Sequence, residues 1–111
     1  MSYIGYLQKT SAISSEFVQN NGLEQRDLRI LEIIFINSFE PNSHLRVIDV
    51  IEITDFGSKA TIHRCLIRMR EAEVIEFFHE PGNYRVKYLK PAKKAVSYFS
   101  KLEQAMLNAK I

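Results

Sequence analysis

The segment that most constrains the fold is residues 58–75, SKATIHRCLIRMREAEVI, because it has the pattern of an amphipathic helix. Ser58 can cap this helix, since a serine hydroxyl accepts a hydrogen bond from a backbone amide of the first turn. The inward positions recur at spacings of four and three, with a cysteine at the edge of the stripe: Ile62, Leu66, Met69 and Cys65. We therefore expect a helix over about residues 58–73 whose first two turns present polar side chains to solvent.

An alternating segment with a Pro-Gly turn follows this helix. Two short strands flank Glu80-Pro81-Gly82-Asn83, which predicts a β-hairpin over residues 75–89. In the second strand, aromatic or apolar residues share one face and basic residues the other: Tyr84, Val86 and Tyr88, against Arg85 and Lys87. We expect the first face to pack on the domain and the second to meet phosphate.

Turn-forming residues divide the rest of the chain into further helices. They are expected over about residues 2–19, 24–39 and 43–53, the third capped by Asn42 or Ser43, with a last helix from Ala92 to about Lys110. Helix, helix and then hairpin is the order of a winged helix-turn-helix. The predicted fold class is therefore α+β, mainly α, in one domain over residues 1–111. It comprises an N-terminal helix and turn (1–21), a winged-helix core (23–90) and a terminal helix (91–111).

The last helix has apolar residues at alternating spacings of four and three, which is a heptad seam: Ala95, Phe99, Leu102, Met106 and Ala109. The seam could pack against its own domain. It could also pair with the same helix, or with the N-terminal helix, of a second subunit. We expect a homodimer, because the apolar N-terminal helix also needs a partner surface. The expected dimer contacts are Tyr6, Phe17, Phe99, Leu102 and Met106.

The net charge of +2 conceals an uneven distribution. Residues 1–57 carry four basic and eight acidic side chains, whereas residues 58–111 carry eleven basic and five acidic ones. A localised basic surface is typical of proteins that contact phosphate. No apolar run reaches the length of a membrane span, no signal segment is visible at the start, and one cysteine excludes an internal disulfide. These features favour a cytoplasmic protein.

The sequence contains no pattern for catalysis or metal binding. The three histidines (His44, His63 and His79) are scattered, and the single Cys65 has no partner at zinc-ligand spacing. Glycine-rich phosphate loops, nucleophile elbows and paired-carboxylate motifs are also missing from the sequence. We therefore expect neither an enzyme nor a cofactor, and Cys65 is interpreted as a small buried residue.

The basic residues of the helix and hairpin differ in the DNA contacts they could make. Arg64 can pair bidentately with guanine in the major groove, and His63 could donate to a base edge. Lys59 and Thr61 stand at the helix start, where the helix dipole favours phosphate. Arg85 and Lys87 would contact the DNA backbone. Two arginines further along the helix, Arg68 and Arg70, are expected to face solvent or acidic neighbours.

The chain resembles the MarR-type winged-helix transcriptional regulators over roughly residues 23–107. Residues 58–66, SKATIHRCL, are similar to that family's S-x-x-T-[VI]-x-R-x-[LV] recognition helix, and residues 71–76 are similar to its E-x-x-G-[LY]-[IV] exit, with Glu73 in place of glycine. Residues 89–95 are similar to its L-T-x-x-G-x-x segment. The resemblance implies a two-fold dimer on a palindromic operator. It places Ser58, Lys59, Thr61, His63 and Arg64 on DNA, with Arg85 and Lys87 of the wing on the flanking backbone or minor groove.

The expected function is sequence-specific binding of double-stranded DNA by a homodimeric transcriptional regulator. An alternative is a winged helix used as a protein-interaction module, favoured by the acidic residues of the expected third helix and its turn, Asp49, Glu52 and Asp55. A replication or partition protein of a mobile element would share the same DNA chemistry. The sequence leaves open the operator, repression or activation, and whether a small-molecule effector exists.

Overall fold

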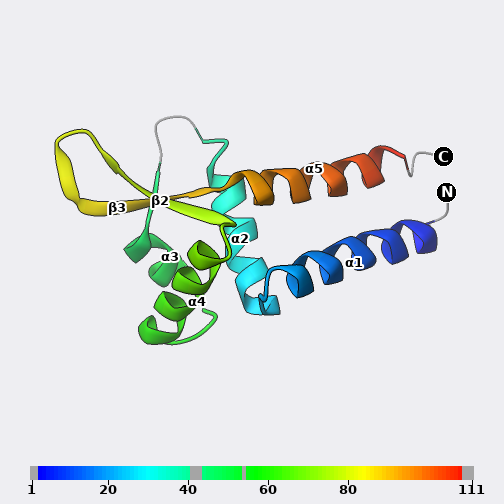
Figure 1. The fold of residues 1–111 in the computed structure, drawn as a ribbon, viewed down its shortest axis with the longest axis horizontal. Coiled ribbons are helices and arrows are strands. Elements are labelled where there is room, and N and C mark those ends of the chain that lie inside the picture. Colours follow the sequence, from blue (N-terminus) through cyan, green and yellow to red (C-terminus); the bar gives the residue numbers. More distant parts are fainter. Residues whose placement is uncertain (1–2, 41–43, 54, 109–111) are drawn as a thin grey trace.

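The computed structural model describes residues 3–40, 44–53 and 55–108. The helices and strands follow one another in the order α1 (Tyr3–Asn20), α2 (Gln25–Asn37), β1 (Leu45–Arg46), α3 (Val47–Ile53), α4 (Lys59–Glu71), β2 (Ile75–Glu80), β3 (Asn83–Pro91) and α5 (Lys93–Leu107). Figure 1 shows two parts: a body formed by α2 to β3, and an arm in which α1 and α5 lie side by side. The predicted fold class, α+β and mainly α, is confirmed.

The body is built around one apolar cluster. Its fully buried side chains come from α2, α3, α4 and the start of β2: Ile30, Leu31, Ile34, Val50, Ile62, Leu66, Met69 and Ile75. The predicted stripe of α4 is confirmed, since Ile62, Leu66 and Met69 are among them and Cys65 is buried beside them. One face of α4 is therefore committed to the core, which leaves its opposite face for solvent or a ligand.

A short strand replaces the first turn of the expected third helix. The sequence predicted a helix from about residue 43, but Leu45 and Arg46 pair with Leu89 and Tyr88 of β3, and α3 begins only at Val47. The sheet therefore has three antiparallel strands in the order β1-β3-β2. Asp49 accepts the Arg46 N–H at 2.9 Å and so closes the start of α3. The expected caps, Asn42 and Ser43, lie outside the described residues.

The turn after α1 is formed as the sequence predicted. Gly22 has a φ of 63°, and the Leu23 N–H donates to the Val18 carbonyl at 2.9 Å. This arrangement closes the end of the helix with a residue in the left-handed region, where glycine has no steric penalty. The chain thereby reverses from α1 into α2.

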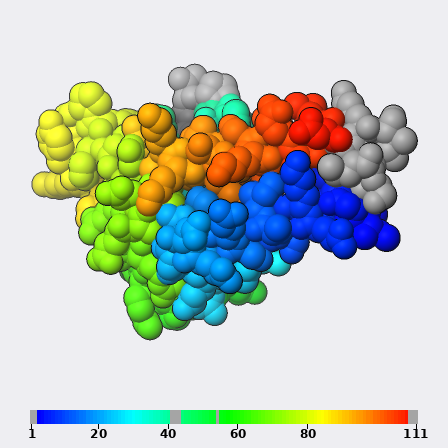
Figure 2. All heavy atoms as spheres, turned by 45° about the vertical axis from the view of Figure 1, so that its right-hand side comes forward, coloured from blue at the N-terminus to red at the C-terminus, as the bar shows by residue number. Residues whose placement is uncertain are grey.

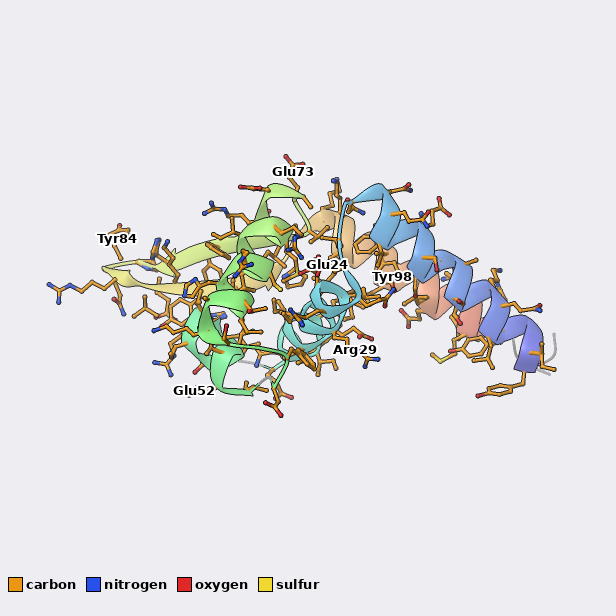
Figure 3. The ribbon with its side chains drawn as sticks, turned by 90° about the horizontal axis from the view of Figure 1, so that it is seen from below. Glu24, Arg29, Glu52, Glu73, Tyr84 and Tyr98 are labelled. Atoms are coloured by element: carbon orange, nitrogen blue, oxygen red, sulfur yellow. The ribbon has the colours of Figure 1, made fainter. Side chains whose placement is uncertain are left out.

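The exit from α4 uses the same left-handed geometry without a glycine. Glu73 has a φ of 62°, and the Val74 N–H donates to the Met69 carbonyl at 3.0 Å. A side chain in this region is disfavoured by about 1–2 kcal/mol. Figure 3 shows Glu73 at the edge of the molecule, where its carboxylate points to solvent.

Aromatic contacts hold the two helices of the arm together and also join the arm to the body. Tyr98 of α5 stacks on Phe17 of α1 with ring centroids 4.1 Å apart, and its hydroxyl shares a hydrogen bond of 2.9 Å with Ser14. Phe99 stacks on Phe35 of α2 at 4.0 Å. Figure 2 shows α1 lying along α5, with the hairpin projecting from the other side of the molecule. In the described part of the chain, no helix is both long and apolar enough to span a membrane.

Candidate nucleic-acid interface

The start of α4 is held by side-chain hydrogen bonds. The Ser58 hydroxyl accepts the Thr61 N–H at 3.2 Å and shares a hydrogen bond of 3.0 Å with the Thr61 hydroxyl. Gly57 precedes this cap at a φ of 155°, and a Cβ there would lie 2.9 Å from Thr61 Cγ2. The glycine therefore allows Thr61 to pack under the turn, and the predicted N-cap at Ser58 is confirmed.

Three polar side chains of the first two turns are exposed, as the sequence predicted: Lys59, His63 and Arg64. No hydrogen bond or ion pair within the described residues occupies their side chains. Thr61 differs from them, because it is half-buried and its hydroxyl is bonded to Ser58. The start of α4 therefore combines the positive end of the helix dipole with two cationic side chains, Lys59 and Arg64, that no carboxylate within the described residues neutralises, which is a surface suited to an anionic partner.

The hairpin β2–β3 forms the predicted wing, but the faces of β3 are the reverse of those expected. Lys87 and Arg85 lie on the same face of β3 as the buried Leu89, because these residues are two positions apart, so the basic face is the one that continues onto the core. Tyr88 lies on the opposite face, where its ring is 5.6 Å from that of Phe78. Arg85 and Lys87 are nevertheless exposed, because the hairpin projects beyond the body.

The tip of the wing is held by the turn and by one side chain. The His79 ring nitrogen Nδ1 lies 2.8 Å from the Val86 carbonyl oxygen across the hairpin. Gly82 occupies the turn at a φ of 83°. Figure 3 shows Tyr84 standing away from the wing, in agreement with its exposed fraction of 76%. The tip is thus a projecting loop on an ordered stem.

A buried ion pair connects α4 to α2. The Arg68 guanidinium nitrogen Nη1 lies 2.8 Å from Asp27 Oδ2 and 3.5 Å from Glu24 Oε2. Asp27 is fully buried, and its Oδ2 also accepts the Glu24 N–H at 2.8 Å. Its Oδ1 has no hydrogen-bond partner within the described part of the chain. The prediction that Arg68 faces acidic neighbours is confirmed, whereas the role of Asp27 was not predicted.

Cys65 lies against the same carboxylate. Burial raises the pKa of its thiol, and the neighbouring Asp27 raises it further. A thiol that resists deprotonation is a poor nucleophile and a poor metal ligand. No group of three or more His, Cys, Asp or Glu side chains in the described residues is arranged to hold a metal ion.

The acidic residues around α3 are not equivalent. Asp49 is held by Arg46, whose Nη2 and Nε lie 2.8 and 3.1 Å from its two carboxylate oxygens. The hydrogen bond from Arg46 lowers the pKa of Asp49 below its usual value. Glu52 and Asp55 are exposed, and no ion pair within the described residues neutralises them. Figure 3 shows Glu52 at the edge of the body.

The arm carries an apolar groove of about 630 Å³ along α5 and the end of α2. Four of the five expected dimer residues line it: Tyr6, Phe99, Leu102 and Met106. The Phe99 ring also stacks on Phe35. Phe17 is instead covered by Tyr98 of the same chain. Ala109 of the expected seam lies outside the described residues.

A second hollow, of about 1060 Å³, lies between the arm and the body. Residues of α1, α5 and β2 line it, with Arg70 and Glu73 at its edge. Lys94 bridges its walls, because its Nζ donates to Asn21 Oδ1 at 3.1 Å and to the Ala72 carbonyl at 2.8 Å. Charged residues are more numerous around this cleft than around the groove, where Glu103 is the charged residue among the described lining.

Comparison with known proteins supports the fold through solved structures and not through sequence. No protein-family model matches the chain, and no curated protein matches it significantly in sequence. Three of the solved structures that share its fold illustrate the match. MarR is 16% identical, with a TM-score of 0.62 over 94% of this chain and 72% of MarR. The Staphylococcus aureus MepR–DNA complex is 11% identical, with a TM-score of 0.65 over 95% of this chain and 86% of MepR.

The third is the transcriptional regulator Tm0710 from Thermotoga maritima, 16% identical, with a TM-score of 0.65 over 92% of this chain and 68% of the other. These matches confirm the resemblance to MarR-type winged-helix proteins at the level of the fold. Any assignment of contacts to the side chains of α4 and the wing rests on the geometry of this chain described above.

Proposed function

We propose that this protein is a transcriptional regulator that binds double-stranded DNA sequence-specifically. The observation that carries the proposal is the free surface of α4, where Lys59, His63 and Arg64 are exposed beside a capped helix start. A wing with two exposed basic residues flanks the same helix, in a fold shared with a protein solved on DNA. A recognition helix presents this end to the major groove.

The side chains differ in what they would read. Arg64 is assigned to a base edge, since a bidentate arginine–guanine contact discriminates by about 1–3 kcal/mol. Lys59 and the cap residues Ser58 and Thr61 are assigned to phosphate, and His63 to a base edge or the adjacent backbone. The wing residues Arg85 and Lys87 are assigned to the flanking backbone, Arg85 with access to the minor groove.

We assign the arm to homodimerisation. The groove and the open ends of α1 and α5 place large apolar side chains in solvent, with exposed fractions of 71% for Tyr3, 72% for Phe39 and 55% for Met106. An exposed apolar patch at the end of a two-helix arm fits a second copy of that arm. Two recognition helices would then meet successive major grooves of a two-fold symmetric site.

The cleft between arm and body gives a small-molecule effector a place to act. A ligand there would contact α5, α1 and the base of the wing at once. It would change DNA affinity only if the cleft differs between free and DNA-bound states. An effector is therefore compatible with this geometry, and the regulator does not require one.

Fluorescence anisotropy with a labelled random-sequence duplex at several salt concentrations tests the DNA proposal. We expect binding that weakens steeply with salt and falls in the Arg64→Ala/Lys87→Ala double variant. Once a preferred site is selected from a random library, Arg64→Ala should relax specificity and Lys87→Ala should weaken all sequences alike. Flat anisotropy at low salt would exclude the regulator.

Sedimentation velocity tests the arm. Met106→Lys should shift the protein from dimer to monomer without unfolding it, because this side chain is exposed in the single chain. Gln8→Lys adds the same charge to a polar exposed position of α1 and serves as the control. A wild-type chain that sediments as a monomer at micromolar concentration would contradict the dimer.

A protein-interaction module is the second candidate, and the exposed carboxylates Glu52 and Asp55 favour it. They lie beside the turn into α4 without a neutralising partner in the described part of the chain, where they would repel a DNA backbone. This candidate predicts no salt-sensitive duplex binding and a partner interaction that survives Arg64→Ala. The anisotropy series separates the two.

A further inference from the structure

One aromatic ring lies between α4 and the wing and contacts a cation from each. Phe77 of β2 is half-buried at the edge of the core, opposite Leu89 in the ladder. The Arg70 guanidinium carbon lies 5.1 Å from the Phe77 ring centroid, and Lys87 Nζ lies 5.8 Å from it. Both distances are within the range of cation–π attraction, so the two cations, one from α4 and one from β3, contact the same ring.

Neither cation has an acidic partner in the part of the chain that the structure describes. No carboxylate within the described residues forms an ion pair with Arg70 or Lys87, although Arg46, Arg68 and Lys90 all have one. Two like charges held at one ring repel each other and attract any anion that reaches both. The arrangement is therefore ready for a negatively charged ligand that spans α4 and the wing.

Arg70 also faces the direction already assigned to DNA. It follows His63 by seven residues, which is close to two full helical turns, so the two side chains lie on one face of α4. A helix whose first turns enter a groove leaves its last turn nearer the groove wall, where phosphates stand. Lys87 approaches the same place from β3.

We propose that Arg70 is a further phosphate contact and that Phe77 is a positioning residue, which holds Arg70 and Lys87 together for one stretch of DNA backbone. The proposal rests on the DNA-binding function and deepens it. It changes the interpretation of Arg70, which the sequence placed in solvent or beside acidic residues. It also gives the recognition helix and the wing a shared contact instead of two independent ones.

The test uses the full-length chain, a random-sequence duplex and the slope of log affinity against log salt. Arg70→Ala should lower that slope by about 1 per bound subunit and weaken all sequences alike. Phe77→Leu should weaken binding roughly three- to tenfold with most of the slope retained, because the cations remain but must be ordered on binding. Phe77→Tyr keeps the ring and should bind like the wild type.

Lys9→Ala is the control, because it removes one exposed cation from α1, which Figure 1 shows running away from the wing. A slope and affinity for Arg70→Ala equal to those of Lys9→Ala would overturn the proposal. So would Phe77→Tyr binding as weakly as Phe77→Leu, since the ring would then have only a packing role. If Phe77→Leu fails to fold, the slope of Arg70→Ala decides alone.

The failure of this inference can be told from failure of the proposed function. A wild-type chain without salt-dependent duplex binding overturns both. A wild-type chain whose binding falls in Arg64→Ala but not in Arg70→Ala overturns only the shared contact.

Discussion

The helices of the body and of the arm have similarly spaced apolar residues, but they bury these side chains to different degrees. In α2 the inward residues Ile30 and Leu31 are completely buried, and α4 fills the other side of the same core. In α1, an 18-residue helix, no described residue is buried, and Tyr3 and Ile4 are largely exposed. The body therefore encloses a core, although some of its apolar side chains such as Ile36 and Phe39 stay exposed, whereas α1 buries no side chain and leaves apolar area for another surface to cover.

We propose that this difference gives the two parts separate tasks. A body with a closed core can hold α4 and the wing rigidly, which a DNA-reading surface requires. An arm with an open apolar face gains stability from association, and its area near the groove of α5 is available for that. We therefore expect the oligomeric state to depend on protein concentration through the arm. The free energy of unfolding should depend mainly on core packing in the body.

The largest expected contrast comes from matching leucine truncations in the two parts. Leu31→Ala should lower the free energy of unfolding by roughly 2–5 kcal/mol, because it opens a cavity in a closed core. Leu7→Ala on α1 should change it by less than about 0.5 kcal/mol in dilute protein, since this side chain is already exposed. Urea titration at low protein concentration measures both, and equal losses would mean that the arm is as closed as the body.

The ion pair between α2 and α4 gives the next largest effect. Arg68→Ala should destabilise the body by about 3 kcal/mol, because it leaves the buried Asp27 carboxylate without its partner. Arg26→Ala removes an exposed arginine from the same helix pair and should cost almost nothing. If urea midpoints of the two variants coincide, Asp27 is hydrated well enough to need no partner.

A smaller change should strengthen the body. Glu73→Gly should raise the free energy of unfolding by about 0.5–1 kcal/mol, since glycine adopts the left-handed φ of 62° without strain but loses more entropy on folding. Glu103→Gly, inside α5, should instead cost about 1 kcal/mol. Thermal unfolding followed by circular dichroism compares them, and a destabilised Glu73→Gly would give its carboxylate a structural role.

The smallest expected effect concerns the arm and pH. Burial raises the pKa of Tyr98 above its ordinary value of 10.0, so the folded state holds this proton more tightly than the unfolded state. Its contribution to stability is therefore complete below pH 10 and is lost as the pH rises beyond it. Tyr98→Phe should cost about 0.5 kcal/mol at pH 7, by loss of the part-buried Ser14 hydrogen bond, and should flatten the decline above pH 10.

Urea titrations between pH 8 and 11 measure that decline. An identical pH dependence in the wild type and in Tyr98→Phe would show that this tyrosine ionises equally in the folded and unfolded states.

Local signals predicted much of the body from the sequence. The cap at Ser58, the stripe of α4 and the Pro-Gly turn each lie within a few residues of the structure they determine, and all three were recovered. The strand β1 was missed, because two residues cannot show alternation and their partners in β3 lie far along the chain. Contacts between distant segments leave no local pattern.

The candidate site shows the same limit. Exposure of Lys59, His63 and Arg64 followed from the helical period alone. The pairing of Asp27 with Arg68 joins residues 41 positions apart and had only an indirect signal, an acidic residue three positions after Glu24. Alternation in β3 divided its residues into two faces correctly, but it could not say which face meets the core, and the expectation was wrong.

The measurement that tests the account most directly is sedimentation of a labelled duplex with the wild-type chain and with Met106→Lys, at low and moderate salt. The account predicts two wild-type chains per selected site, with binding that weakens as salt rises, and much weaker binding of single chains for Met106→Lys. One chain per site with equal affinity in both proteins would contradict the division of work between body and arm. No complex at low salt would contradict the DNA-binding function itself.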